Sequence, residues 1–378
     1  MKIAVVRQRY VSHGGAENVL SHFVGELIRQ GHAVHVFASQ WKEDRGESAA
    51  VVVHRVPVLP GGSFFRLVSF AFFSWLAIRK EKFDMVFSFE RILYQDIYRA
   101  GDGCHREWLH QRRLSPLKRA LVRLNPFHWA SLLIEKQIYT GNRVKKIIAN
   151  SRRGKEEIIR HYGTPSEKIE VIYNGVDLIR FHPANRERYR DTIRSHFGVD
   201  SSQLLLLFVG SGFERKGLGF LIEAAGILKR RLPSFKLLVA GKGDRLAYLK
   251  MARRVGIENE ILFIGTFKEI PQLYAAGDLL VLPTLYDPFA NVCLEGMAAG
   301  LPVITTRMNG ASELLEGPLA SLVLEEPFDT EGLAKIILTV ADRDHRTELG
   351  HLSRRVAERF PEKTHFDRLI SVYNGLLH

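Results

Sequence analysis

Cysteine is scarce in this sequence, and long uninterrupted apolar runs are missing. Cys104 and Cys293 are the only cysteines among 378 residues, and neither lies in a CxxC pair or a histidine-rich stretch. The sequence therefore gives no sign of a disulfide framework or a zinc site, and a reducing, cytosolic compartment is expected. The most apolar stretch, residues 64–78, is interrupted by Arg66 and is shorter than the ~20 residues that span a bilayer.

Acidic residues are fewer than basic ones. The chain has 41 Asp and Glu against 54 Lys and Arg, which gives a net charge of +13. An excess of this size favours anionic partners such as nucleic acid, phosphorylated glycans or acidic lipid, without choosing among them. The first residues, MKIAVV, are followed by Arg7 and Arg9 before an apolar region of signal-peptide length can form. We therefore expect a first strand there, and not a targeting segment.

The length and the apolar pattern predict two α/β domains, because 378 residues are too many for one ordinary core. Nearly continuous apolar runs, typical of parallel strands covered by helices on both faces, occur in two series. We expect the strands at residues 3–6, 33–38, 84–89, 146–149 and 169–173, then 204–210, 235–241, 261–265, 278–283, 302–306 and 320–324. The predicted fold class is α/β, with two Rossmann-like, doubly wound parallel sheets that bind ligands at the carboxyl ends of their strands.

The predicted boundaries follow from the charge and proline content. We expect an N-terminal domain over residues 1–178, a crossover over 179–203 and a C-terminal domain over 204–360. Residues 361–378 are expected to form a helix that packs back on the N-terminal domain.

Glycines follow the first predicted strand at Gly14 and Gly15, within the sequence HGG. Missing side chains at a strand-to-helix turn let a phosphate approach backbone N–H groups. A plain tight turn explains the same residues equally well. The complete GxGxxG of a dinucleotide fold is absent, which argues against dinucleotide binding.

The loop GSGFERKG, residues 210–217, brings Arg215 and Lys216 to the end of a predicted strand. Arginine grips a phosphate with two N–H groups, and lysine adds a mobile point charge. Together they suit the diphosphate of a leaving group. The alternative is a solvated basic loop.

The stretch YDPFANVCLE, residues 286–295, places Asp287 before a predicted helix and Glu295 upon it. The N-terminus of that helix can direct N–H groups at phosphate. Glu295 lies one turn after Asn291, where its two oxygens can accept hydrogen bonds from the paired hydroxyls of a ribose. Asp287 can then bind sugar hydroxyls. The alternative is a helix-start acid and a salt-bridge partner, with equal weight on this evidence.

The run LLVLPTLYDPFANVCLEGMAAGLPVITT resembles the nucleotide-sugar signature of family four retaining glycosyltransferases of the GT-B fold. VIYNGVD, GSGFERKG, VAGKGD and HGG resemble that family in the expected order, so the resemblance covers essentially the whole chain. It implies that Arg215 and Lys216 contact the diphosphate, Glu295 the ribose and Asp287 the donor sugar, with no metal and no cofactor. The further substrate-binding residues that it implies are Gly14, Gly15, Gly241, Phe289, Ala290, Asn291 and Val292.

Two positions depart from the family pattern. The first motif acid is commonly Glu, and here it is Asp287, one methylene shorter; Ala290 stands where Gly is frequent. Both departures concern the donor sugar more than the type of reaction.

A narrower resemblance is to bacterial lipopolysaccharide core glucosyltransferases. It implies an acceptor-binding N-terminal domain and a nucleotide-sugar-binding C-terminal domain. The favoured reaction is transfer of a hexose, glucose first, from a UDP-sugar to a glycan or glycolipid of the lipopolysaccharide core. Asp102 then lies near the acceptor hydroxyl, although pairing with Arg99 or Arg106 is an equal alternative. A nucleotide-sugar epimerase and a non-catalytic binding protein remain the rival functions.

The middle of the chain carries most of the excess charge: residues 99–160 hold fifteen Lys or Arg against five Asp or Glu. Within it, residues 105–133 mix arginines with leucines and tryptophans, a pattern of helices that lie on anionic membranes. An ordinary helix with buried leucines is the commoner origin of such patterns. No nucleic-acid-binding motif accompanies the charge, so no nucleic-acid partner is expected. We expect a cytoplasmic protein, peripheral on the inner face of the membrane. The basic and apolar residues concerned are Arg112, Arg113, Lys118, Arg119, Arg123, Trp108, Leu117, Leu121, Leu124, Phe127 and Trp129.

Overall fold

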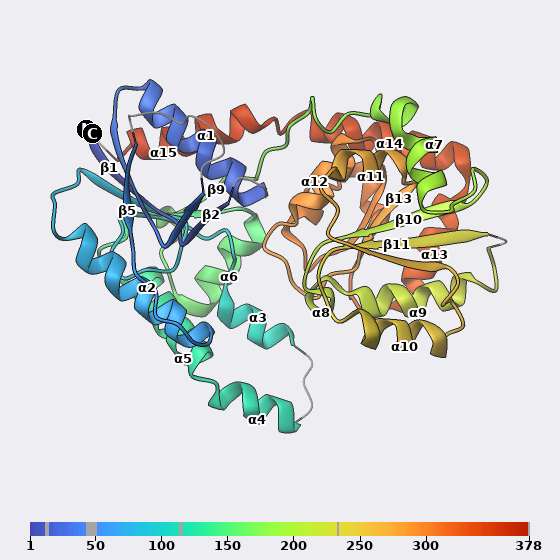
Figure 1. Ribbon diagram of the computed structural model, residues 1–378, viewed down its shortest axis with the longest axis horizontal. Helices are drawn as coiled ribbons and strands as arrows, with labels where there is room; N and C mark the ends of the chain where they lie inside the picture. Colours follow the sequence, from blue (N-terminus) through green and yellow to red (C-terminus); the bar gives the residue numbers. More distant parts are fainter. Residues whose placement is uncertain (12–14, 43–50, 113–115, 233, 377–378) are drawn as a thin grey trace. The chain divides into compact units, whose positions relative to one another are not determined.

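The computed structural model describes residues 1–11, 15–42, 51–112, 116–232 and 234–376, and these form two α/β units (Figure 1). Unit 1 comprises Met1–Tyr173 together with Lys363–His378, and unit 2 comprises Asn174–Glu362. Both contain a parallel β-sheet. The predicted fold class, two parallel-sheet α/β domains, is confirmed.

The sheet of unit 1 has seven parallel strands in the order β5-β3-β1-β6-β7-β8-β9. In that order the strands are Val51–Arg55, Ala33–Ala38, Lys2–Val6, Met85–Ser88, Ile97–Arg99, Lys146–Ala149 and Ile169–Val171. A separate parallel pair joins β2 (Arg9–Val11) to β4 (Gln40–Lys42).

Helices cover both faces of the unit 1 sheet, and the alternation along β1 divides its side chains between them. Ile3 and Val5 pack with residues of α1 and α15 on one face, whereas Ala4 and Val6 pack with residues of α2 on the other. The C-terminal helix thus completes a core that begins at the third residue. The helices of unit 1 are α1 (Gly15–Arg29), α2 (Ser63–Ile78), α3 (His105–Gln111), α4 (Pro116–Leu124), α5 (Pro126–Thr140), α6 (Arg152–Tyr162) and α15 (Glu362–Asn374).

The sheet of unit 2 has six parallel strands in the order β12-β11-β10-β13-β14-β15. In that order they are Ile261–Gly265, Phe235–Ala240, Leu204–Val209, Leu279–Leu282, Val303–Thr306 and Val323–Leu324. Every residue of β10 is buried, as the apolar run predicts for a central strand. The helices are α7 (Asn185–His196), α8 (Phe213–Lys216), α9 (Leu218–Leu228), α10 (Arg245–Arg254), α11 (Ile270–Ala276), α12 (Asn291–Ala298), α13 (Thr330–Ala341) and α14 (Arg343–Ala357).

The expected crossover at residues 179–203 has a different structure. It contains α7, and the whole stretch belongs to unit 2, which begins at Asn174. Three arginines of α7 explain this placement, because Arg186, Arg190 and Arg194 all pair with the buried carboxylate of Asp278. The charged residues from which we expected a crossover between domains instead attach α7 to unit 2.

The predicted strand at residues 320–324 is mostly wrong. A 3-10 helix occupies Gly317–Leu322, and only Val323–Leu324 form a strand. Pro318 lies in the first turn of that helix, where its fixed φ suits helix entry and its missing N–H group would interrupt a strand ladder.

The described helices include none that is long and apolar enough to cross a membrane. The apolar residues 64–78 form α2, which lies beside α5 in unit 1 (Figure 1).

Candidate active site

The loop after β10 brings two cations to one carboxylate. Lys216 Nζ lies 2.5 Å from Oδ2 of Asp287, and Arg215 Nη1 lies 2.8 Å from the same oxygen. Lys216 is buried, with 8% of its surface exposed, whereas the Arg215 side chain remains partly open to solvent. The structure therefore brings together three residues that the sequence analysis assigned to the site.

Glycine and backbone hydrogen bonds fix this loop. Gly217 has a φ of 81°, and a Cβ atom there would lie 1.8 Å from the carbonyl oxygen of Pro283. The Arg215 carbonyl accepts hydrogen bonds from Leu285 N, at 2.9 Å, and from Thr284 Oγ1, at 2.7 Å. α8 is thus attached to the segment after β13 that leads to Asp287. Only a residue without a side chain permits so close an approach.

Asp287 is buried, and hydrogen bonds fix both its side chain and its backbone. Its Oδ1 accepts from Phe289 N at 3.2 Å, and its backbone pairs with Met308 and Gly310. Burial by itself would raise the pKa of this carboxyl, but Lys216 and then Arg215 outweigh it and hold the pKa of Asp287 below its usual value. Asp287 is therefore ionised, and it neutralises much of the positive charge that reaches the strand end.

The N-terminus of α12 adjoins this cluster. Phe289 and Ala290 are buried at its start, and Asn291 and Val292 form its first turn, partly exposed. The side-chain oxygen of Asn309 accepts from Ala290 N at 3.0 Å, and that of Asn291 accepts from Asn174 Nδ2 at 2.6 Å.

Asn309 is a residue that the sequence analysis missed. It is completely buried, and its amide nitrogen also donates to Thr305 Oγ1 at 3.0 Å. Asn309 follows β14, and the carboxyl ends of parallel strands meet at one edge of the sheet. That position could have identified it as a candidate for the site.

Glu295 lies on α12, one turn after Asn291. Its Oε2 accepts a hydrogen bond of 3.0 Å from the hydroxyl of Tyr274, a second residue that the sequence analysis missed. Burial raises the pKa of Glu295, although Tyr274 and the positive charges of Arg180 and Lys216 partly offset it. Within the described part of the chain its Oε1 has no hydrogen-bond partner, so this oxygen can accept from a ligand.

A pocket of about 430 Å³ lies at the carboxyl ends of β10, β11 and β12. Gly241 lines it with Phe213, Lys242 and Arg245. A Cβ atom at Gly241 would lie 2.1 Å from the carbonyl oxygen of Gly210, so the two loops meet where neither has a side chain. The pocket offers an aromatic ring, cations and backbone groups within reach of the Lys216 loop.

The unit 1 candidates lie at the carboxyl ends of its own strands. Asp102 follows β7 and is exposed. Its charge acts on Glu90, Arg91 and Arg99, but within the described residues no ion pair joins it to Arg99 or Arg106. Burial, and in part Asp102, raises the pKa of Glu90, which also pairs with Arg7 at 3.4 Å. Gly15 begins α1, while Gly14 lies outside the described residues.

Unit 2 thus presents an anion-binding arrangement. At the carboxyl ends of β10 and β13, the buried Lys216 and the partly exposed Arg215 lie close to the N-terminus of α12. Glu295 lies one turn further along α12, and its Oε1 makes no hydrogen bond among the described residues. Such groups stabilise negative charge on a phosphate and accept hydrogen bonds from hydroxyls.

Comparison with known protein families assigns both units. The model described as Glycosyltransferase Family 4 matches residues 13–180, and the model described as Glycosyl transferases group 1 matches residues 203–343. The chain belongs to the family four glycosyltransferases. Transfer of a sugar to an acceptor is therefore its reaction class, and the rival functions of epimerase and non-catalytic binding protein are not favoured.

Individual glycosyltransferases extend the similarity over most of the chain. The lipopolysaccharide glucosyltransferase WaaG of Escherichia coli K12 is 26% identical over 340 residues, which cover 89% of this chain and 88% of WaaG. An uncharacterized glycosyltransferase of Methanocaldococcus jannaschii is 34% identical over 175 residues, 45% of this chain and 44% of that protein.

Solved structures agree on the fold. A crystal structure of WaaG superposes with a TM-score of 0.84 at 24% identity and covers 98% of this chain and 99% of its own. HepE of Anabaena, solved in complex with UDP and glucose, gives a TM-score of 0.72 at 21% identity, with 99% of both chains covered. The glycosyltransferase thus has the GT-B fold.

Proposed function

We propose that this glycosyltransferase moves a hexose, glucose in the first place, from a UDP-sugar to a glycan or glycolipid acceptor of the lipopolysaccharide core. The observation that carries the proposal is the contact of Lys216 and Arg215 with Asp287, just before the helix α12 that carries Glu295. The similarity to WaaG over 89% of the chain supports the acceptor class. The complex of HepE with UDP and glucose, in the same fold, supports the donor.

In this proposal the diphosphate binds at Lys216, Arg215 and the N-terminus of α12. An ammonium has three N–H groups and a guanidinium has five, so their bonds to Asp287 leave donors for phosphate oxygens. Phe289, Ala290, Asn291 and Val292 form the entry to that helix.

Glu295 accepts from the ribose hydroxyls through its free oxygen. The base enters the pocket beside Gly241, and Asp287 takes the donor sugar. These assignments spread the nucleotide along the carboxyl ends of three neighbouring strands, β11, β10 and β13, as ligands bind in open parallel sheets.

The proposed catalytic step is stabilisation of the departing diphosphate. As the bond between sugar and phosphate breaks, Lys216, Arg215 and the α12 N-terminus meet the growing negative charge. These cations supply the charge compensation that a metal ion supplies elsewhere, so we propose metal-independent transfer with retention at the anomeric carbon. In unit 1, Asp102 orients the acceptor hydroxyl or takes its proton. Gly14 and Gly15 bind substrate; Gly15 begins α1, and Gly14 lies outside the described residues.

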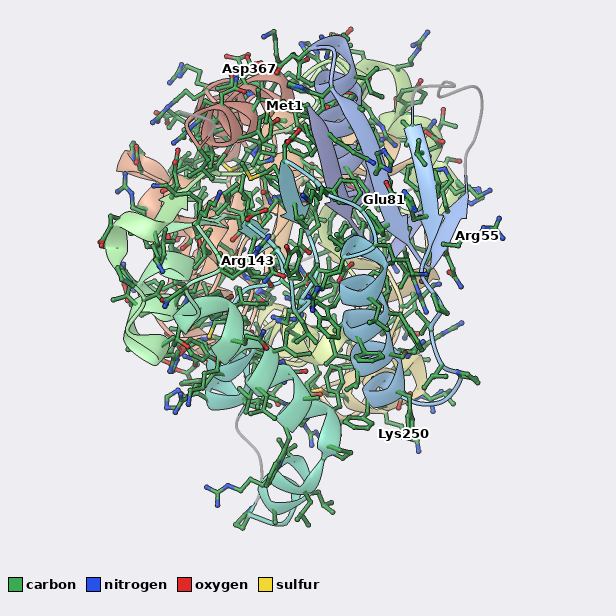
Figure 2. The ribbon with its side chains drawn as sticks, turned by 90° about the vertical axis from the view of Figure 1, so that its left-hand side faces the viewer. Met1, Arg55, Glu81, Arg143, Lys250 and Asp367 are labelled. Carbon is green, nitrogen blue, oxygen red and sulfur yellow. The ribbon has the colours of Figure 1, made fainter. Side chains whose placement is uncertain are left out.

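We also propose that unit 1 binds an anionic membrane surface on the cytoplasmic side, through residues 105–133. α4 projects from unit 1 beyond α5 (Figures 1 and 2). Leu121 and Leu124 on α4 are 60% and 76% exposed, and Trp129 on α5 is 63% exposed. Large apolar side chains beside arginines suit the boundary between headgroups and acyl chains. Arg113 lies outside the described residues, as do the side chains of Leu117, Lys118 and Arg119.

The deciding experiment measures transfer from UDP-glucose to lipopolysaccharide core acceptor in the presence of a chelator, with the products analysed by mass spectrometry. We expect Lys216→Ala to lower kcat about 100- to 1000-fold, the loss typical of one donor to a developing oxyanion. We expect Glu295→Ala to raise the donor KM roughly 10- to 100-fold, because bonds to a charged group are worth about 1.5–3 kcal/mol.

Lys250→Ala and Glu331→Ala are matched controls, since both side chains are exposed on other helices of unit 2. Unchanged turnover in both site variants would remove the site assignment. Transfer from another nucleotide-sugar would correct the donor, and epimerised donor without transfer would overturn the proposal.

A further inference from the structure

The amino ends of the unit 2 strands line a cavity of about 880 Å³. Leu204 begins β10, Asp278 precedes β13, and both line it. Gly210 and Asp287 follow the opposite ends of the same two strands. Six residues of β10, at about 3.3 Å each, put roughly 20 Å between the two edges. A ligand in this cavity is therefore distinct from a donor at the Lys216 site.

The lining of this cavity is strongly basic. Among the described residues that form it, Asp278 is the single acid. Arg354 is occupied elsewhere, because its Nη1 donates to three carbonyl oxygens and its Nε pairs with Glu358. The arginines of the lining are Arg186, Arg190, Arg343, Arg346 and Arg354.

Asp278 cannot neutralise this charge, because its oxygens are already shared. Oδ1 accepts from Arg186 and from Arg190, both at 2.9 Å, and Oδ2 accepts from Arg194 and from Leu205 N. Three guanidinium groups thus share one buried carboxylate. Burial, followed by repulsion from Arg190, lowers the pKa of Arg186.

Two arginines of α14 face the same cavity without touching Asp278. Arg343 is exposed, and in the described part of the chain its guanidinium makes no hydrogen bond or ion pair; its carbonyl oxygen accepts from Thr347 Oγ1. Arg346 donates to the carbonyl oxygens of Val340 and Ala341 and repels Arg186. The anchoring of α7 to Asp278 explains the arginines of α7, and the carbonyl oxygens at the end of α13 explain Arg346, but neither contact explains Arg343.

We propose that this cavity is a second ligand site of the enzyme, which binds a phosphate-bearing small molecule other than the sugar donor. Arg186, Arg190 and Arg343 bind the phosphate oxygens, for which guanidinium groups offer paired N–H donors. Ser201 and Ser202 line the same cavity and suit the rest of a polar ligand. Ser234 and Thr347 also line it, but their hydroxyls already bond to Gln203 Nε2 and to the Arg343 carbonyl. The volume lies in the range of small-molecule sites.

Calorimetric titration with inorganic pyrophosphate tests the site on the full-length protein. We expect two classes of binding site in the unmodified enzyme. Arg343→Glu should weaken pyrophosphate binding at the basic cavity at least tenfold and leave binding at the Lys216 site unchanged. Lys216→Ala should weaken binding at the Lys216 site and leave binding at the cavity unchanged. Arg253→Glu, an identical charge change at an exposed position of α10, should bind as the unmodified enzyme does.

Complete loss of pyrophosphate binding in Lys216→Ala, with no change in Arg343→Glu, would overturn the second site. Absence of any binding beyond the Lys216 class in the unmodified enzyme would do the same. Circular dichroism checks that each variant is folded, and Arg186→Gln, at a partly exposed arginine, replaces Arg343→Glu if that variant fails to fold. The test separates this inference from the proposed transfer reaction, because donor turnover by Arg343→Glu is measured independently.

Discussion

At the scale of single residues, Lys216 interacts with both acids of the stretch YDPFANVCLE, Asp287 and Glu295. Its Nζ pairs with Asp287, and its charge also acts on Glu295. The two carboxyls nevertheless have opposite pKa shifts, below the usual value at Asp287 and above it at Glu295. The difference arises because Asp287 touches two cations, whereas Glu295 bonds only to a neutral tyrosine among the described residues.

The lowered pKa of Asp287 predicts a stability change in acid. A carboxyl whose pKa falls on folding contributes stability above its unfolded value, about 3.9, and loses it as pH falls through the folded value. Asp287→Asn should therefore unfold more easily than the unmodified enzyme at neutral pH, and the difference should shrink below about pH 4. Denaturant unfolding at a series of pH values measures this. A difference that is constant with pH would show that ionisation of Asp287 does not stabilise unit 2.

The sequence predicted the charged residues of the site but not their supports. Arg215, Lys216, Asp287 and Glu295 follow strand ends or lie on the next helix, so their approach could be predicted from the order of apolar runs. Asn309 and Tyr274 were not assigned, because neither lies in a charged motif, although Asn309 follows the predicted strand at residues 302–306. Their roles depend on which backbone N–H group or carboxylate the completed fold brings near them.

At the scale of elements, α7 illustrates how charge can mislead. Its charged residues suggested a crossover between domains, yet the Arg194 side chain is only 2% exposed and forms an ion pair with Asp278. The edge strand β5 was missed as well: its side chains are partly exposed, and its run of valines ends at His54 and Arg55. Position in the sheet does not decide the outcome, because the edge strands β9 and β12 were predicted, whereas the interior strand β7, three residues long, was missed.

We predict that Asp278→Asn destabilises unit 2 by roughly 3–5 kcal/mol, the cost of leaving buried charge without its partner. Three guanidinium groups would then lack their shared acceptor. Thermal unfolding measures the loss. Asp344→Asn, at an exposed acid of α14, is the control and should unfold as the unmodified enzyme does. An equally stable Asp278→Asn would show that this cluster does not hold α7.

For the helix pair α4 and α5, we predict membrane binding through both charge and apolar contact. Each basic residue near an anionic surface is worth about 1 kcal/mol, so reversing Arg112 and Arg123 should weaken vesicle binding at least tenfold. Leu121→Gln combined with Leu124→Gln should weaken it independently of salt. Sedimentation with vesicles containing anionic lipid measures both effects.

Lys250→Glu is the control for membrane binding, because this exposed residue lies on α10 of unit 2 (Figure 2). Equal sedimentation of all variants would refute the surface role of residues 105–133. Loss with the arginine variant alone would restrict the contact to headgroup charge.

At the scale of the whole molecule, the chain leaves unit 1 after Tyr173 and returns to it at Lys363. The two connecting segments pair within unit 2: Val176 N donates to Phe360 O at 3.0 Å, and Glu362 N donates to Val176 O at 3.1 Å. After the return, Phe366, Leu369 and Tyr373 enter the core of unit 1. The sequence analysis expected residues 361–378 to return to the N-terminal domain, but apolar periodicity alone could not identify which residues they would contact.

We therefore predict that residues 363–378 are required by unit 1 and dispensable for unit 2. A chain ending at Glu362 should lose cooperative unfolding of unit 1, because the buried side chains of α15 are missing from its core. Limited proteolysis followed by mass spectrometry should show rapid cleavage within residues 1–173 and protection of residues 174–362. Equal protection of both parts would show that α15 adds little to unit 1.

This connectivity also sets an order of events during synthesis. Ribosomes make unit 1 first, yet α15, which its core needs, is encoded after all of unit 2. Unit 2 can fold as soon as its own chain has emerged, while one sheet face of unit 1 has α1 but still lacks α15. The first half of the enzyme to be translated is thus the last to be finished, and for that interval part of its apolar core remains exposed.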